Sequence, residues 1–250
     1  MTRFHSVALA AAVLAGIALA WHNFVLLRAA VAGLLLVMGL GVALPQLRLF
    51  GNYICRGSTA SKRVALTFDD GPDPRSTPQL LEWLRTEKIS ATFFCIGQKV
   101  EANPDLAAEI VRDGHLLQNH SHAHSNFTNF YGTARLQREL ELTQTAIQKA
   151  TGVAPVYFRP PVGLSNPNTF RAAKKLNLQV IGWTIRSLDT IIRDPSKIVV
   201  RITRGLRPGA IILLHDGNIP AEKLLATVKS SLDSLRRLGY EVVRLDELLK

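Results

Sequence analysis

The chain has 250 residues, of which 47% are hydrophobic, and its formal net charge at pH 7 is +11. That length allows one large domain or two small ones. The positive charge would suit nucleic acid, but Lys and Arg are scattered and no recognisable nucleic-acid-binding motif is present, so we predict no nucleic-acid partner and favour anionic lipid or an acidic glycan.

Two apolar runs, residues 7–20 and 29–44, open the chain. Each is shorter than the ~20 residues that a membrane-spanning helix needs. We interpret them as two tilted or slightly extended spans with a tight turn between them. The alternatives are a single span over residues 24–44 and a signal peptide with the small-x-small cleavage pattern at residues 18–20. As spans they contact membrane lipid, which predicts an integral protein of a bacterial cell membrane.

Basic residues flank the two runs, with Arg3 before the first and Arg48, Arg56, Lys62 and Arg63 after the second. Positive charge gathers on the cytoplasmic side of spanning helices, so this distribution favours two cytoplasmic ends. A single span would place the remainder on the opposite side. We assign residues 1–48 to a membrane anchor, the polar Gly- and Ser-containing residues 49–61 to a linker, and residues 62–250 to one soluble domain.

Strand-like apolar runs alternate with helix-like segments beyond residue 61. The predicted strands are residues 64–68, 91–97, 116–119, 156–159, 180–185, 210–214 and 242–245. The predicted helices are residues 78–88, 104–112, 133–150, 168–176, 196–206 and 221–238. This alternation predicts an α/β fold with a parallel sheet, either a barrel or a doubly wound sheet. Cys95 lies inside a strand and is predicted to be a core thiol, and two cysteines imply no disulfide framework.

Polar residues gather where the predicted strands end, which is where α/β barrels build their sites. In chain order they are Asp69, Asp70, His120, Arg159, Arg186, Asp189, His215 and Asp216. Adjacent residues at a strand end point in different directions. One of Asp69 and Asp70 can therefore hold a metal while the other takes a proton, and an Asx turn is the structural alternative.

The segment 119–124, Asn-His-Ser-His-Ala-His, is a candidate metal site. His120 and His124 are four residues apart, which brings two imidazoles together on a helical turn or in a tight loop. Two His residues and a carboxylate suit Zn²⁺ with one position open for water, and a polar surface loop is the alternative. The spacing of His122 points it elsewhere, and Asn119 is a candidate to orient a ligand from behind.

His215 and Arg159 each have two interpretations. A histidine that emerges from a buried strand is either a general acid that works near neutral pH or a core histidine. Arg159 either pins a carboxylate through a bidentate contact or makes an ordinary structural ion pair.

Four motifs occur in order: Thr67-Phe68-Asp69-Asp70-Gly71-Pro72, His120-Ser121-x-x-His124, Arg159-Pro160-Pro161-x-Gly163 and Leu213-Leu214-His215-Asp216. Through them residues 62–250 resemble the polysaccharide deacetylase family (NodB homology domain, carbohydrate esterase family 4). The resemblance implies a distorted (β/α)7 barrel and a divalent metal, most often Zn²⁺, with Co²⁺ or another ion as the alternative. It also implies hydrolysis of the N-acetyl group of amino sugars in a chitin-oligosaccharide or peptidoglycan type of glycan.

The resemblance further implies a role for each matching residue. Asp70, His120 and His124 bind the metal. Asp69 is the general base for the attacking water, and Arg159 holds it. A backbone N–H in the turn Pro161-Val162-Gly163 receives the acetyl oxygen. His215 protonates the leaving amine, Asp189 pairs with His215 and raises its pKa, and Trp183 and Leu213 wall the pocket of the acetyl methyl group.

This sequence departs from the family pattern at two positions. Val162 stands where the family often has Tyr, and Thr190 follows Asp189 where an aromatic residue is frequent. Because the oxyanion donor is a backbone N–H, Val162 permits catalysis but reshapes the sugar site.

Three other functions compete with N-deacetylation of a glycan. The apolar runs and the positive charge after them suit removal of an acyl or formyl group from a lipid-linked amino sugar at the membrane face. Some members of the family cleave acetyl esters of xylan. The third alternative is an inactive glycan-binding module, which has no need of a base, an acid and a metal together.

Overall fold

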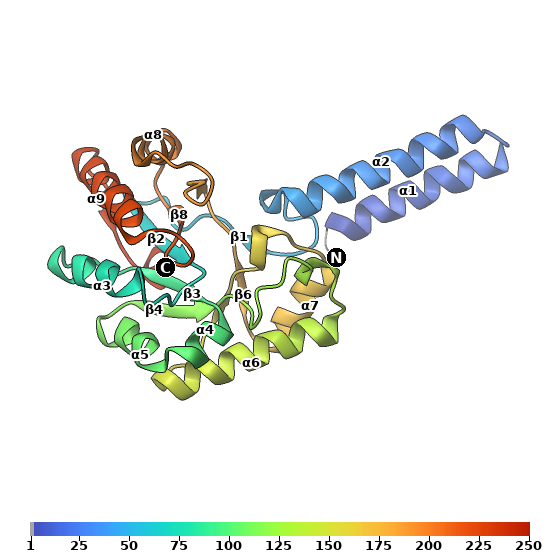
Figure 1. The fold of residues 1–250 in the computed structure, drawn as a ribbon. Helices are drawn as coiled ribbons and strands as arrows, with labels where there is room; N and C mark the ends of the chain where they lie inside the picture. The colour runs from blue at the N-terminus through green and yellow to red at the C-terminus, as the bar shows by residue number, and fades with distance from the viewer. Residues whose placement is uncertain (1–2) are drawn as a thin grey trace.

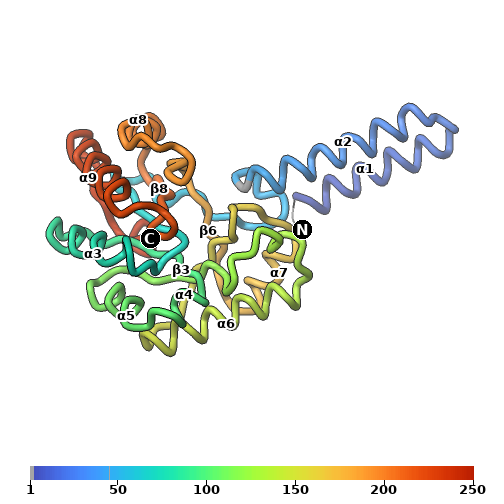
Figure 2. The backbone as a smooth tube through the Cα atoms, in the orientation of Figure 1, coloured from blue at the N-terminus to red at the C-terminus, as the bar shows by residue number. Residues whose placement is uncertain are grey.

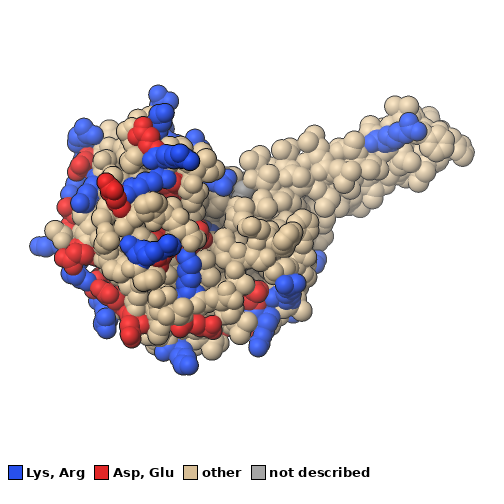
Figure 3. Space-filling view, viewed as in Figure 1, with Lys and Arg blue, Asp and Glu red and all other residues tan. Residues whose placement is uncertain are grey.

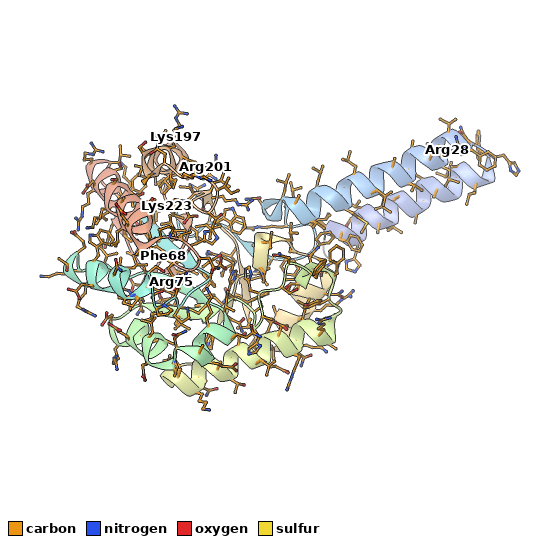
Figure 4. All side chains as sticks on the ribbon, in the orientation of Figure 1. Arg28, Phe68, Arg75, Lys197, Arg201 and Lys223 are labelled. Atoms are coloured by element: carbon orange, nitrogen blue, oxygen red, sulfur yellow. The ribbon has the colours of Figure 1, made fainter. Side chains whose placement is uncertain are left out.

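Two apolar helices form a hairpin that projects from the rest of the chain in this computed structural model, which describes residues 3–250 (Figure 1). They are α1 (Arg3–Ala20) and α2 (Phe24–Ala43). Asn23 caps α2, because its side chain accepts the backbone N–H of Leu26 at 3.0 Å. The space-filling view shows one basic side chain near the far end of the hairpin, where Arg28 lies, and a largely uncharged surface along its length (Figures 3 and 4).

The hairpin leaves large apolar side chains exposed. Val25 is 77% exposed, and Leu35 and Leu36 are each 64% exposed. At 1.5 Å per residue the two helices are about 27 and 30 Å long, close to the ~30 Å hydrocarbon core of a bilayer. Both helices are therefore long and apolar enough to cross a membrane, although a signal sequence near the N-terminus meets the same criteria. Their exposure separates them from the core helices of a soluble protein.

One curled sheet contains all the strands of the described chain. They are β1 (Tyr53–Ile54), β2 (Arg63–Asp69), β3 (Thr92–Cys95), β4 (Leu116–Asn119), β5 (Tyr157–Phe158), β6 (Gln179–Ile181), β7 (Ile185–Arg186), β8 (Ala210–His215) and β9 (Glu241–Val242). The strand order is β1-β6-β5-β4-β3-β2-β8-β7, and β9 pairs with β2. Every strand pairing is parallel, so the C-terminal ends of the strands share one mouth.

The segment between β6 and β7 joins the two ends of the sheet. β6 pairs with β1 and β5, whereas β7 pairs with β8 at the opposite end of the strand order. Between them, Gly182 donates its N–H to the carbonyl of Ile54 and Thr184 donates to that of Ile211, both at 2.8 Å. The predicted single strand over residues 180–185 is therefore wrong, because this segment changes partners as it crosses the barrel.

Helices cover the outside of the sheet, and Figures 1 and 2 show α6 running beside α4, α5 and α7. Their bounds are α3 (Thr77–Thr86), α4 (Gly97–Ala102), α5 (Pro104–Arg112), α6 (Thr133–Thr151), α7 (Pro167–Lys175), α8 (Pro195–Gly205), α9 (Ala221–Arg237) and α10 (Leu245–Leu248). Three 3-10 turns complete the chain: η1 (Pro45–Leu47), η2 (Thr128–Phe130) and η3 (Pro161–Gly163). Local signals set several ends: Asn166 forms a capping box on α7, and Asp194 accepts the N–H of Ser196 to start α8.

Side-chain alternation along β2 separates the core from the site. Val64, Leu66 and Phe68 are fully buried in the apolar cluster that includes side chains of α3 and α9. Ala65 belongs to a second cluster, with Ile211 of β8, inside the barrel. Because successive side chains of a strand point to opposite faces, Asp69 lies on the inner side with Ala65.

The structure confirms the predicted parallel α/β barrel, and each predicted helix is present with ends shifted by at most a few residues. β1, α4 and α10 were not expected. The last predicted strand was placed too far along the chain, since β9 ends at Val242 and Leu245 begins α10. Cys95 is fully buried, as predicted, and both Cys55 and Cys95 are free thiols.

Residues 49–61, expected to be a linker, contact the barrel along much of their length. Tyr53 and Ile54 form β1, Tyr53 is fully buried, and Gly57 donates its N–H to the carbonyl of Gly209 at 2.8 Å. Phe4 of α1 donates its N–H to Leu49 O at 2.9 Å, and its ring lies 5.6 Å from that of Phe50. The proposed domain limits stay a prediction, but part of the expected linker belongs to the sheet.

Two glycines with left-handed backbone test this packing. A Cβ at Gly209 (φ +78) would lie 2.5 Å from Ser58 O, whereas a Cβ at Gly239 (φ +73) would meet nothing within 4 Å. Gly239→Ala should therefore cost only the backbone strain, about 1–2 kcal/mol, and Gly209→Ala should cost clearly more. Thermal unfolding of the full chain in detergent measures both. Equal losses would mean that residues 57 and 58 do not pack on the barrel.

Candidate functional site

Polar and ionisable side chains meet at the C-terminal mouth of the barrel. Asp69 ends β2 and His215 ends β8, and these two residues are register partners on neighbouring strands. His120 follows β4 and Arg159 follows β5. Parallel strands in register thus bring together residues that are almost 150 positions apart in the chain.

Asp70, His120 and His124 form a compact cluster. Asp70 Oδ1 lies 3.4 Å from His120 Nε2 and 3.2 Å from His124 Nε2. The candidate ligand atoms all lie within 4.8 Å of one another. Asp70 Oδ1 is buried and has no hydrogen-bond partner among the described residues.

The environments of the two imidazoles indicate which kind of ligand this cluster could bind. His120 Nδ1 lies 2.7 Å from the carbonyl oxygen of Arg159, which can only accept, so Nδ1 carries a proton and Nε2 is the ring nitrogen that faces Asp70. Burial and the neighbouring His120 lower the pKa of His124, which favours a neutral ring with a lone pair on Nε2. Three electron-pair donors that face one another, with one carboxylate oxygen unpartnered, fit a divalent cation such as Zn²⁺.

The loop that carries both histidines is tight rather than helical. Ser121 (φ 65) and His124 (φ 48) adopt left-handed backbone. Asn119 braces the loop from behind, because its Oδ1 accepts the N–H of Ser121 at 2.9 Å and its Nδ2 donates to Leu140 O at 2.9 Å. Glu139 of α6 accepts further loop N–H groups, which no motif in the sequence revealed.

Asp69 is held by a fully buried arginine. Arg159 Nη1 donates to Asp69 Oδ1 at 2.6 Å and to Thr67 Oγ1 at 2.9 Å, and Nη2 donates to Gly182 O at 3.0 Å. The guanidinium lies 4.1 Å from the centroid of the Phe94 ring. A buried charge pair needs this many hydrogen bonds to offset its desolvation, so the geometry of Asp69 is closely constrained.

His215 forms a second buried pair with Asp189. His215 Nδ1 lies 2.8 Å from Asp189 Oδ1, and the backbone N–H of His215 donates to Oδ2 at 2.8 Å. Burial alone would lower the pKa of His215, but the hydrogen bond and charge of Asp189, helped by Asp69 and Asp70, raise it to about 9. Nε2 of His215 therefore carries a proton at neutral pH.

A cavity of about 180 Å³ connects these groups. Trp183 and Leu213 both line it, and Trp183 is only 8% exposed because its ring lies where a side chain on Gly163 would otherwise be. In the turn η3, Pro161 has no N–H and Gly163 donates its own to Pro160 O at 3.1 Å. The N–H of Val162 has no acceptor among the described residues, so it is the amide available to a ligand.

All the residues predicted from the sequence thus lie at or directly behind this mouth. Arg159, Pro161 and Asp189 do not line the cavity themselves, because they are buried behind its wall. His122 points away and lies 3.2 Å from Glu101, as its spacing indicated. Thr190, which the sequence marked only as a departure from the family pattern, lines the cavity. Like Glu139, Lys223 of α9 had no signal in the sequence, and it donates to the carbonyl of Asp189.

Comparison with known proteins gives a consistent result. Residues 56–181 match a family model described as polysaccharide deacetylase. A peptidoglycan-N-acetylglucosamine deacetylase of Bacillus cereus is 35% identical over 76% of this chain and 89% of its own length. A chitooligosaccharide deacetylase of Bradyrhizobium sp. is 32% identical over 76% of this chain and 92% of its own length. A peptidoglycan-N-acetylglucosamine deacetylase of Listeria monocytogenes is 34% identical, but only 39% of its length is covered.

Solved structures agree with the sequence relatives. A CE4 family pseudoenzyme from Bacillus anthracis matches with a TM-score of 0.74 and 29% identity, over 80% of this chain and 69% of that one. A family 4 carbohydrate esterase from Streptomyces lividans, in complex with acetate, matches with a TM-score of 0.67 and 35% identity, over 74% and 92%.

Two histidines of the loop, His122 and His124, give a matched test of the candidate metal cluster. His124→Ala removes one of three ligands and should weaken Zn²⁺ binding strongly, whereas His122→Ala in the same loop should leave it unchanged. Calorimetric titration of the metal-stripped full chain in detergent measures both affinities. Equal affinities in the two variants would contradict the cluster as a metal site.

Proposed function

The chain belongs to the polysaccharide deacetylase family, carbohydrate esterase family 4, and on that premise we propose that it is a metal-dependent hydrolase that removes the N-acetyl group from amino sugars of a glycan. The bond cleaved is a linear amide, and the glycan is of the peptidoglycan or chitooligosaccharide type. The observation that carries the proposal is the convergence of a held carboxylate, a protonated histidine and a cluster of three ligands on one cavity.

Asp69 is the general base in this proposal. Its carboxylate faces the cavity and takes the proton of the attacking water. Arg159 fixes one carboxylate oxygen at 2.6 Å, which leaves the other oxygen to accept the proton. The bonds that Arg159 makes to Thr67 and Gly182 O prevent the base from turning away.

His215 is the general acid. An amide nitrogen is a poor leaving group, so it has to be protonated as the C–N bond breaks. The Asp189 carboxylate fixes Nδ1 of His215 and leaves the protonated Nε2 for the departing amine. Hydrolysis of an acetyl ester needs this proton much less, so the pairing of His215 and Asp189 favours the N-acetyl substrate over acetylated xylan.

Asp70, His120 and His124 would hold the divalent metal. When bound there, the ion supplies a Lewis acid that polarises the acetyl carbonyl and lowers the pKa of water. In this proposal the free N–H of Val162 donates to the oxygen of that carbonyl as negative charge develops on it. Trp183 and Leu213 are the apolar walls that suit the acetyl methyl group.

A pseudoenzyme among the solved structures makes the inactive glycan-binding module a fair alternative. In this chain, however, the buried charges Asp69 and Arg159, the pair of His215 and Asp189, and the three ligands are all present. A binding surface has no use for a base and an acid held at such a desolvation cost.

Acetate release tests the proposal directly. The full chain in detergent with Zn²⁺ or Co²⁺ should release acetate from chitin oligomers or peptidoglycan. Asp69→Asn should lower kcat by a factor of about 100 to 10,000, the range of general base catalysis, while Zn²⁺ stays bound. Asp70→Ala should lose both the metal and the activity. Wild-type protein that is loaded with metal and releases no acetate from any N-acetyl glycan would overturn the proposal.

The dependence of activity on pH tests the acid. The reaction needs protonated His215, so kcat should fall as the pH rises through about 9. Asp189→Asn removes the charged carboxylate that raises the pKa of His215, so the effect of burial, which lowers that pKa, becomes dominant. The alkaline limb of the pH–activity profile should therefore move toward the ordinary histidine pKa of 6.5. Asp194→Asn removes an exposed carboxylate of the same connection between β7 and α8 and serves as the control, for which we expect an unchanged pH profile. An unmoved limb in Asp189→Asn would assign the acid to another group.

A further inference from the structure

Four arginines line a second cavity, of about 340 Å³, beside the candidate site. Arg3 begins α1, Arg48 follows η1, Arg56 follows β1 and Arg207 precedes β8. All four are exposed, and no Asp or Glu is among the residues that line this cavity. We call these residues the arginine pocket.

The charge of the arginine pocket is not compensated within the described chain. None of the four guanidinium groups makes an ion pair with a carboxylate, whereas Arg75, Arg85, Arg236 and Arg244 elsewhere on the surface each do. Arg3 and Arg56 are instead fixed through backbone carbonyls, those of Leu47 and Pro208 at 3.0 and 2.9 Å. Guanidinium groups held near one another without an acidic partner form a binding site for an anion, and their planar forks suit phosphate.

The role of basic residues in orienting membrane spans does not by itself explain the arginine pocket. Arg3, Arg48 and Arg56 flank the two apolar helices in the sequence, as basic residues at the ends of membrane spans often do. Arg207 lies about 160 positions beyond α2, and the tertiary fold brings it to the same cavity. Arginines that serve only to orient the membrane spans would not need to meet Arg207 in one cavity.

The arginine pocket shares a wall with the candidate site. Trp183 lines both cavities, and its neighbour Thr184 lines the arginine pocket. Thr184 is bonded to both sides of the barrel, because its Oγ1 donates to Cys55 O at 2.5 Å and its N–H to Ile211 O. The two cavities therefore border the same segment, which these hydrogen bonds hold in place.

We propose that the arginine pocket is the phosphate subsite of this enzyme and that its substrate is an N-acetyl amino sugar joined through phosphate or diphosphate to a membrane lipid. This inference rests on the proposed deacetylase function and names its substrate class. In a 2-acetamido sugar the N-acetyl group and the glycosidic oxygen are on adjacent ring carbons. A phosphate on that oxygen lies within one sugar ring of the acetyl carbonyl, as the shared Trp183 wall requires.

The position of the arginine pocket suits a lipid more than a soluble sugar phosphate. Arg3 starts one apolar helix and Arg48 lies just beyond the other, at the end of the hairpin opposite Arg28 (Figures 1 and 4). If the hairpin spans the bilayer, this end lies at the depth of the lipid head groups. A phosphate bound there leaves the acyl or prenyl chain free to run along the exposed apolar side chains of α1 and α2.

Three substrates test the inference on the full chain in detergent micelles, and the first two of them differ only in the diphosphate. They are N-acetylglucosamine joined to a polyprenol through diphosphate, the same sugar joined to the same polyprenol as a simple glycoside, and soluble chitotetraose. The variant Arg48→Gln/Arg207→Gln removes two guanidinium groups for which no hydrogen bond is found in the described chain. The matched variant Arg112→Gln/Arg138→Gln removes two exposed arginines of α5 and α6.

The double variant in the arginine pocket should lose about tenfold to hundredfold of kcat/KM on the diphosphate substrate, as expected for lost charge-assisted contacts. Its activity on the glycoside and on chitotetraose should not change, and the matched variant should behave as wild type on all three. Equal losses on all substrates, or none, would overturn the inference and leave the deacetylase proposal standing. If added phosphatidylglycerol abolishes the preference for the diphosphate substrate over the glycoside, the arginine pocket binds a bilayer head group. That result would also overturn the inference.

A binding measurement separates this inference from the proposed function. Asp69→Asn protein should bind the diphosphate lipid more tightly than the glycoside in calorimetric titrations, and adding Arg48→Gln/Arg207→Gln should abolish the difference. If wild type releases no acetate from any substrate but this difference is present, the deacetylase proposal fails and the phosphate subsite stands. If the difference is absent, the subsite is refuted whatever the activity.

Discussion

Arg159 is the residue on which the candidate site depends most. Its guanidinium is fully buried and bonds to Asp69, to Thr67 and to the carbonyl of Gly182, while its own carbonyl accepts the proton of His120 Nδ1. One residue thus orients Asp69, the proposed base, directs the ring of His120, a proposed ligand, and ties both to the segment that joins the ends of the sheet. A charge buried this deeply is tolerated only because each of these partners is in place. The same bonds therefore support the barrel and the chemistry.

Adjacent carboxylates take different environments because of backbone geometry. Asp69 is the last residue of β2, where strand alternation turns it into the barrel interior toward Arg159. Asp70 leaves the strand with φ 71, which turns its carboxylate toward the imidazoles of His120 and His124. Asp69 is paired with a fixed guanidinium, whereas Asp70 faces two imidazole nitrogens. This difference in partners fits the proposed roles of Asp69 as the base and Asp70 as a metal ligand.

The hairpin and the barrel are joined more closely than an anchor on a flexible linker would be. β1 extends the sheet, Phe4 packs on Phe50, and Arg3 reaches the cavity that borders Trp183. The apolar helices consequently have a defined position next to the site rather than a tethering role alone. That position is the reason why the lipid-linked substrate, which the sequence offered only as an alternative, gains physical support from the arginine pocket.

The sequence alone determined the local features of this protein. Apolar runs of strand and helix length and the four motifs with Asp69, Asp70, His120, His124, Arg159 and His215 were sufficient to predict the parallel barrel and the residues at its mouth. Those signals are local, since each depends on neighbours within a few positions. The division of residues 179–186 between two ends of the sheet, the placement of β1 in that sheet, the free N–H of Val162 and the meeting of Arg207 with Arg3 and Arg48 were decided by the tertiary structure. Each arises from contacts between segments more than 20 positions apart, or from a turn whose shape those contacts impose, and no local pattern of residues encodes them.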